Sequence, residues 1–243
     1  MIALFTDFGA HDIYVAQMKA ALLARNPAAT ILDLLHSVPA FRVQSAAHLL
    51  AAVQAPFPAG TIFVAVVDPG VGTPRRAAVV RADDKWYLGP DNGLLSVLAA
   101  RAARRTVWHV AWAPPRLSPS FHGRDLFAPL AAMIATGELP ADALSEVTQL
   151  DVVLASDDLA EIIYIDHYGN AMTGLRGSMV RDDVVIRLRD AELFHARVFA
   201  DVPVGTAFWY VNSIGLVEIA ANRASAAKLM DIDIGNAVEM LGG

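Results

Sequence analysis

The chain has 243 residues, of which 55% are hydrophobic and 18% are charged, and it carries a net charge of −6 and no cysteine. The lack of cysteine excludes a disulfide framework and a thiol nucleophile, and the acidic balance argues against a nucleic-acid partner. The apolar excess suggests a membrane protein, but no stretch reaches the ~18–20 uninterrupted apolar residues of a spanning helix. A signal peptide is not expected either, because Asp7 follows a short apolar run. We therefore expect a cytoplasmic protein with no membrane contact.

The first two-thirds of the sequence alternate between strand and helix patterns. Apolar runs predict strands, apolar residues at helical spacing predict helices, and Gly, Pro and Asn separate them. The predicted strands cover residues 2–6, 30–35, 61–67, 77–80, 85–88 and 106–110, and the predicted helices cover residues 12–26, 43–53, 94–103 and 125–136. This alternation predicts an N-terminal α/β sandwich domain with a mostly parallel sheet over residues 1–155.

Residues 156–243 show a different pattern, in which Gly and Asp or Asn turns separate short strand-like runs. Residues 224–230 alone have a helical spacing. Regularly spaced short strands are typical of a small all-β barrel, and we predict one for this C-terminal domain. The predicted strands cover residues 162–165, 184–188, 193–202, 207–211 and 216–220.

Candidate catalytic residues follow the strongest strands. Asp7 and Asp68 each come directly after a predicted strand, where open α/β sheets bind their ligands. Arg75 lies near the end of the loop that begins at Asp68, and His122 lies in a loop that leads into a helix. An Asp, an Arg and a His from neighbouring loops offer an acceptor, a fixed cation and a proton shuttle. Such a set can hold and polarise a water molecule.

Each of these residues also has a structural interpretation, which the residues alone leave open. A carboxylate at a strand end, such as Asp7 or Asp68, is equally compatible with a helix or turn cap. His122 alone is typical of a partly buried structural histidine, and Asp91 is expected to cap the helix after Gly93. The remaining histidines show no metal-ligand spacing, so we expect no metal site.

Six sequence blocks, each weak alone, occur in an order that covers essentially the whole chain. They are Thr6-Asp7-Phe8-Gly9, Val67-Asp68-Pro69-Gly70-Val71-Gly72-Thr73 with Arg75-Arg76, Pro90-Asp91-Asn92-Gly93, Ser120-Phe121-His122-Gly123-Arg124-Asp125, Asp166-His167-Tyr168-Gly169-Asn170 and Asn212-Ser213. Together they resemble the S-adenosyl-L-methionine (SAM) hydroxide adenosyltransferase family, which is related to SAM-dependent fluorinases and chlorinases. The resemblance implies an α/β domain, a C-terminal β-barrel and a homotrimer. The active sites would lie between the N-terminal domain of one subunit and the C-terminal domain of its neighbour.

The resemblance also implies a reaction, in which water or hydroxide attacks the ribose C5′ of SAM and displaces L-methionine to leave adenosine. The catalytic residues of the family match Asp68, Arg75 and His122. We expect Asp68 to accept the water proton and Arg75 to favour hydroxide character. His122 is expected to position the water or to shuttle its proton. SAM is then the substrate, and no cofactor is expected.

Substrate-binding roles carry over from the same resemblance. Asp7 matches the acceptor for both ribose hydroxyls, Asp166 the partner of the methionine ammonium, Asn170 an adenine contact and Ser213 a contact to the methionine carboxylate. Two aromatic residues match positions that pack near the substrate, but they are equally compatible with core packing. These two are Phe41 and Tyr168.

Two departures from the halogenases favour water over a halide ion as the nucleophile, and a third concerns the methionine carboxylate. Asp68 stands where a fluorinase has Tyr, and a carboxylate there would repel a halide ion. The hairpin between Arg81 and Pro90 lacks the extra loop of the halogenases. Ile214 stands where they have an Arg, so backbone N–H groups near Ser213 are left to bind the methionine carboxylate. A chlorinase-like halide adenosyltransferase and a non-catalytic SAM- or adenosine-binding module remain the competing hypotheses.

Overall fold

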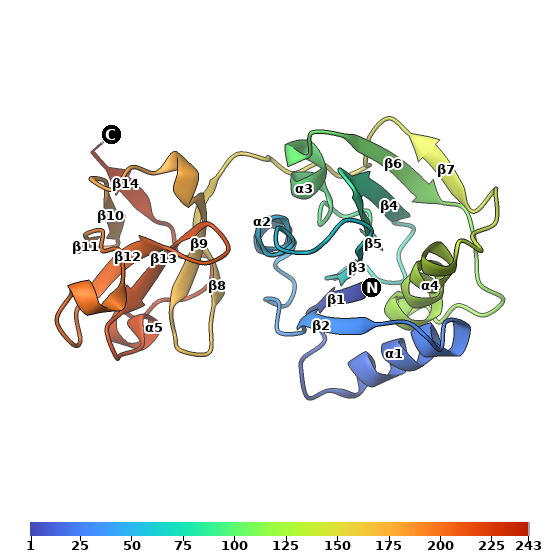
Figure 1. Ribbon diagram of the computed structural model, residues 1–243, viewed down its shortest axis with the longest axis horizontal. Coiled ribbons are helices and arrows are strands. Elements are labelled where there is room, and N and C mark those ends of the chain that lie inside the picture. The colour runs from blue at the N-terminus through green and yellow to red at the C-terminus, as the bar shows by residue number, and fades with distance from the viewer. Residues whose placement is uncertain (243) are drawn as a thin grey trace. The chain divides into compact units, whose positions relative to one another are not determined.

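The computed structural model describes residues 1–242, which form two compact units (Figure 1). The first unit comprises Met1–Leu50 and Pro56–Ser156, and the second comprises Ala51–Ala55 and the chain from Asp157. No helix in this described range is long and apolar enough to cross a membrane.

The first unit is built on a mixed sheet with the strand order β2-β1-β3-β5-β4-β6-β7. Strands β2, β1, β3 and β5 pair in parallel, whereas β4 pairs antiparallel with β5 and β6, and β7 antiparallel with β6. Since β6 then runs in the direction of β5, the sheet is mainly parallel, as predicted. The strands are β1 (Ile2–Thr6), β2 (Ile31–Leu35), β3 (Ile62–Val66), β4 (Ala77–Ala82), β5 (Lys85–Pro90), β6 (Arg105–Val110) and β7 (Leu144–Val147).

Helices α1 (Ile13–Arg25) and α4 (Ala128–Thr136) pack against each other and against this sheet (Figure 1). Their apolar faces join the buried side chains of β1 and β3, strands whose residues are all buried. Continuous apolar strands of this kind are expected where a sheet is covered on both faces. The remaining helices of the α/β part are α2 (Val43–Val53) and α3 (Ser96–Arg101).

Two predicted helices differ from the observed ones. The helix predicted over residues 94–103 is limited to α3. The segment predicted to open α4 is instead a π-helical turn over Gly123–Phe127, directly after His122. Such wide turns frequently occur at functional sites.

The second unit consists of antiparallel sheets with the strand orders β12-β13-β9-β8 and β11-β10-β14. The pairings between named strands keep these two sheets separate within the described residues, while isolated bridges join Glu161 to Ala237 and His195 to Trp209. Closure into a barrel stays a prediction. The elements are β8 (Leu159–Ile165), β9 (Ala171–Arg176), β10 (Val185–Leu188), β11 (Ala191–Leu193), β12 (Ala207–Val211), β13 (Leu216–Ala221), α5 (Ala226–Leu229) and β14 (Glu239–Leu241).

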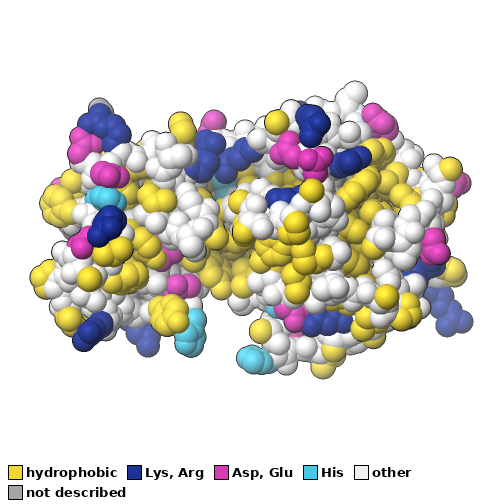
Figure 2. All heavy atoms as spheres, viewed as in Figure 1, with side chains coloured by type: hydrophobic (Ala, Val, Ile, Leu, Met, Phe, Trp, Pro, Cys, Tyr) yellow, Lys and Arg dark blue, Asp and Glu magenta, His cyan; other side chains and the backbone are white. Residues whose placement is uncertain are grey.

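The strand predicted over residues 193–202 is wrong. Strand β11 ends at Leu193, and Phe199–Asp201 forms a 3-10 turn whose residues are not buried. The apolar residues that suggested a strand include Phe194 and Val198, and both are exposed. Figure 2 likewise shows hydrophobic side chains on much of the visible surface, so part of the apolar excess lies outside the core.

Candidate active site

Two carboxylates leave the same edge of the first sheet. Strands β1 and β3 are parallel neighbours with Thr6 beside Val66. Asp7 follows Thr6 directly, and Asp68 follows the end of β3 after one intervening residue. Burial raises the pKa of Asp7, and the nearby charge of Asp68 acts in the same direction, whereas the backbone N–H groups of Phe41 and Asp7 oppose both. The two acidic groups are therefore electrostatically coupled at the position where open α/β sheets bind ligands.

Asp68 forms a bidentate ion pair with Arg75. Arg75 Nε donates to Asp68 Oδ1 at 2.8 Å, and Arg75 Nη2 donates to Asp68 Oδ2. The Asp68 side chain is 5% exposed and the Arg75 side chain 10% exposed. Paired hydrogen bonds between ions in a buried setting fix both groups in one geometry.

His122 completes this cluster from the other loop. Its Nδ1 lies 3.0 Å from Arg75 Nη2. Because a guanidinium only donates, Nδ1 is the acceptor and the neutral ring carries its proton on Nε2. Burial lowers the pKa of His122, the positive charge of Arg75 lowers it further, and Asp68 and Asp125 act in the opposite direction. The imidazole is therefore neutral at neutral pH, its Nε2–H group can donate a hydrogen bond, and it accepts a proton only when Nδ1 gives up its bond to Arg75.

The loops that carry these side chains approach closely at Gly72. This residue has a φ of +81°, and a Cβ there would lie 2.6 Å from the carbonyl oxygen of Pro119. Any side chain at this position would separate the loop that follows Asp68 from the loop that precedes His122. Glycine is thus required where the loops that carry Asp68 and His122 meet.

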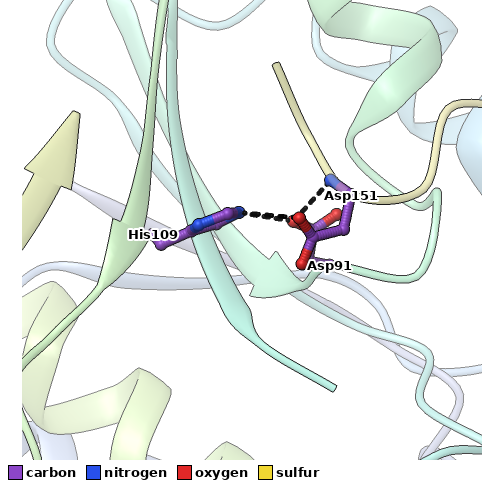
Figure 3. A group of neighbouring side chains, drawn as sticks. All are labelled: Asp91, His109 and Asp151. Carbon is purple, nitrogen blue, oxygen red and sulfur yellow. Dashed lines mark hydrogen bonds and ion pairs between the residues drawn. The ribbon is translucent and has the colours of Figure 1, made fainter. Parts of the chain in front are cut away.

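The expectation that Asp91 caps a helix is wrong. Its buried carboxylate accepts hydrogen bonds from the backbone N–H groups of Asp151 and Val152, at 2.9 and 3.3 Å, and lies 3.0 Å from His109 Nε2 (Figure 3). Asp91, His109 and Asp151 lie close enough to share a cation. However, Arg76 Nη1 lies 2.8 Å from His109 Nδ1, which leaves the proton on Nε2 and a positive charge beside the cluster. These contacts fit a structural network better than a metal site.

The second unit contains a cavity of about 670 Å³, a size typical of small-molecule sites. Asp166, Tyr168 and Asn170 line it from the turn between β8 and β9. Asp166 Oδ1 accepts the backbone N–H groups of Tyr168 and Asn170, and Oδ2 accepts Asn170 Nδ2 at 3.0 Å. Three of the predicted binding residues are thus brought together. The other lining residues are Phe199, Tyr210, Ala221, Arg223, Ala224 and Ser225.

The remaining predicted binding residues lie elsewhere. Ser213 is exposed in the turn between β12 and β13 and does not line the cavity. Phe41 is 76% exposed, with a φ of +64°, in the first unit. Tyr168, which does line the cavity, is also 75% exposed. Core packing, the alternative considered for both aromatic residues, is therefore wrong.

Sequence reasoning missed two charged residues of the cavity region. Arg223 lines the cavity, and its φ of +54° is a strained backbone conformation. No sequence motif predicts either property. Glu218 is buried and lies 2.6 Å from the hydroxyl of Tyr210 and 2.7 Å from Asn212 Nδ2. Burial raises the pKa of Glu218. A lone carboxylate between apolar residues of a strand was the signal that could have identified it.

The fold and these side chains define a two-unit α/β protein with an Asp–Arg–His cluster in one unit and a cavity of small-molecule size in the other. Residues 2–144 match the SAM hydroxide adenosyltransferase N-terminal domain, and residues 160–239 match the SAM hydroxide adenosyltransferase C-terminal domain. The chain therefore belongs to the SAM hydroxide adenosyltransferase family.

Curated relatives match the chain over nearly its whole length. The (R)-S-adenosyl-L-methionine hydrolase of Thermus thermophilus is 36% identical over 97% of both chains. That of Salinispora arenicola is 35% identical over 100% of this chain and 98% of its own. A fluorinase of Actinopolyspora mzabensis is more distant, at 27% identity over 99% of this chain and 96% of its own. The crystal structure of an uncharacterized conserved protein from Thermotoga maritima superposes with a TM-score of 0.89, at 32% identity and full coverage of both chains.

Proposed function

We propose that the protein is a SAM hydrolase, which converts SAM and water to adenosine and L-methionine. The observation that carries this proposal is the buried cluster of Asp68, Arg75 and His122 beside Asp7, in a chain whose relatives at 35–36% identity are named for this activity. Because those names specify the (R)-sulfonium epimer, this epimer is the first substrate to test.

In the proposed reaction, a water oxygen forms a bond to ribose C5′ while the C5′–S bond breaks. The bonding electrons go to sulfur, so the sulfonium cation leaves as the neutral thioether of methionine, and the water loses one proton. Bulk water, with a pKa of ~15.7, is a poor nucleophile at neutral pH and needs polarisation. The cluster supplies an acceptor in Asp68, a cation in Arg75 and a neutral imidazole in His122.

The hydrogen bonds of the cluster support the role that we propose for each residue. Arg75 holds the carboxylate of Asp68 in a fixed orientation, so that the carboxylate can accept the water proton without turning. The positive charge of Arg75 favours hydroxide character in the attacking water. His122, neutral and bonded to Arg75, is proposed to position the water through its Nε2–H group, or to carry the proton away once Nδ1 is free of Arg75. The proposed reaction needs neither a metal nor a cofactor.

Substrate binding is assigned to both units. We assign Asp7 to the ribose hydroxyls and Phe41 to apolar packing near the substrate. In the second unit, Asp166 is assigned to the methionine ammonium, Asn170 to adenine and Tyr168 to ring packing. Their shared turn supports these assignments. Ser213, with the backbone N–H groups beside it, is assigned to the methionine carboxylate.

The proposed assembly rests on the family resemblance, whereas the domain boundary rests on the change of sequence pattern. We propose a domain boundary at residues 155–156, a C-terminal barrel and a cytoplasmic homotrimer whose sites combine the N-terminal domain of one subunit with the C-terminal domain of its neighbour. The compact unit that ends at Ser156 supports the boundary. Exposed large side chains such as Ile13, Val153 and Met179 are consistent with further burial between subunits.

Incubation of the purified protein with each sulfonium epimer of SAM, with and without chloride, tests the proposal. Chromatography is expected to show adenosine and methionine in equal amounts at both salt conditions. A 5′-chloro-nucleoside would instead support the halide adenosyltransferase, and tight binding without turnover would support the SAM-binding module. The Asp68→Asn variant controls for a contaminating hydrolase, because its preparation should form no adenosine above background.

A further inference from the structure

A second set of hydrogen bonds holds the backbone next to both members of the Asp68–Arg75 pair. Asn92 Nδ2 donates to the carbonyl oxygen of Val67, directly before Asp68, at 2.9 Å. The carbonyl oxygen of Arg76, directly after Arg75, accepts from Arg75 Nη1 and from the backbone N–H of Asp91, both at 3.0 Å. The segment Asp91–Asn92, which follows β5, thus contacts the backbone next to Asp68 and the backbone next to Arg75.

The side chain of Arg76 is tied to the same segment through a histidine. Arg76 Nη1 donates to His109 Nδ1 at 2.8 Å, and His109 Nε2 donates to Asp91 Oδ2 at 3.0 Å. Figure 3 shows how His109 on β6 points at Asp91, which the backbone N–H of Asp151 also binds. The Arg76 side chain is 61% exposed, so few other groups hold it, and its hydrogen bond to His109 restrains its orientation.

The members of this network are placed to act through other residues. Asp91 and His109 are buried, and the Asp91 side chain has no exposed surface. A buried carboxylate is costly unless hydrogen bonds compensate it, and Asp91 has three such contacts. His109 in turn has both ring nitrogens engaged, so its tautomer and orientation are fixed.

We propose that Asp91, Asn92 and His109 are positioning residues for the Asp68–Arg75 pair. Asn92 fixes the carbonyl before Asp68, and Asp91 and His109 fix the carbonyl and side chain of Arg76. Together they set the alignment of carboxylate and guanidinium that polarises the water, in a site where displacement by about 1 Å can cost 10²-fold in rate. This inference rests on the proposed function of the pair.

Variants of His109 test the network by kinetics. His109→Leu removes the acceptor for Arg76, and kcat is expected to fall about tenfold with KM unchanged. His109→Asn keeps an acceptor near the position of Nδ1 and is expected to restore kcat to within threefold of the wild type. Asn92→Asp replaces the group that donates to the Val67 carbonyl oxygen by an acceptor. It should lower kcat about tenfold, because the backbone next to Asp68 is no longer held.

Ser96→Ala is the matched control. The buried Ser96 hydroxyl donates to the carbonyl oxygen of Gly93 and accepts the backbone N–H of Leu154, so it anchors the same stretch of chain without contact to Arg76 or Val67. This variant should lose stability but keep kcat. Wild-type kcat in both His109→Leu and Asn92→Asp, or an equal loss of kcat in Ser96→Ala, would overturn the proposal.

A measurement that needs no turnover separates this inference from the proposed function. The Arg75 Nε–H group, bonded to Asp68, gives a 15N-correlated NMR signal that Arg75→Lys identifies. Its hydrogen exchange should be about tenfold faster in His109→Leu than in the wild type and in His109→Asn. Equal exchange in all three proteins would contradict positioning even if SAM is cleaved. Failure of the wild type to cleave SAM would contradict the proposed function and leave the exchange result valid.

Discussion

The cluster at the end of β3 and the cavity of the second unit differ in how their polar groups are satisfied. In the cluster, Asp68, Arg75 and His122 bond to one another and are largely shielded from water. In the cavity, Tyr168 and Arg223 are exposed. The groups proposed for chemistry are therefore preorganised, whereas two of the side chains that line the cavity are left open to solvent. Variants of the cluster should lower kcat, and variants of the cavity should raise KM.

Removal of the proposed proton acceptor should have the largest effect. Asp68→Asn keeps the size of the side chain but presents an amide to the Arg75 guanidinium and removes the negative charge. We expect kcat to fall about 10³-fold, within the range for loss of a general base. Initial rates of adenosine formation measure it, with circular dichroism as the control for folding. A loss smaller than tenfold would remove Asp68 from the proposed mechanism.

Replacement of the arginine fork by a point charge should come next. Arg75→Lys keeps a cation but cannot make the paired bonds to Asp68 together with the bonds to His122 and the Arg76 carbonyl. We expect about a 10²-fold loss in kcat and little change in KM, measured by steady-state kinetics. Full activity in this variant would show that charge alone, without the fixed geometry, is sufficient.

A change in the cavity should affect binding instead. Tyr168→Ala removes an exposed ring that lines the cavity and contacts the ring of His167. We expect KM for SAM to rise about tenfold, or ~1.4 kcal/mol of binding free energy, with kcat within twofold. Tyr168→Phe keeps the ring and serves as the matched control. If kcat falls and KM stays constant, the proposed division of roles between the two regions is wrong.

The smallest expected effect concerns pH. Because burial and Arg75 lower the pKa of His122 below its usual 6.5, the neutral form persists as the pH falls through 6.5. The value of kcat should therefore change less than twofold between pH 8 and 6.5 and should decline only at lower pH, where a second cation would form beside Arg75. His122→Asn should shift or abolish this acid limb. A midpoint above 6.5 in the wild type would contradict the assignment.

Part of the proposed catalytic cluster could be predicted from the sequence because local rules place its members. Asp7 and Asp68 end apolar strands that pair in parallel, so they had to leave one edge of the sheet. The contact between Arg75 and His122 could not be read in the same way, because it depends on two irregular loops. Those loops meet through the close approach at Gly72, which is a property of the folded backbone.

Elements that depend on distant contacts were the ones missed. No strand was predicted over β9, which contains Gly174. A Cβ on Gly174 would lie 2.7 Å from the Leu159 carbonyl oxygen, so the glycine allows a close strand pairing. The π-helical turn after His122 has no local sequence pattern of its own. Arg223 and Ser225 reach the cavity from the segment after β13, which carries no motif.

The most direct test of the account follows the oxygen atom. Turnover of SAM in water enriched in ¹⁸O, in the presence of chloride, should give adenosine with one ¹⁸O at the 5′ position and unlabelled methionine, as detected by mass spectrometry. This result would show that water forms the new bond at C5′. Adenosine without the label, or a 5′-chloro-nucleoside in its place, would contradict the central claim that the Asp68–Arg75–His122 cluster activates water.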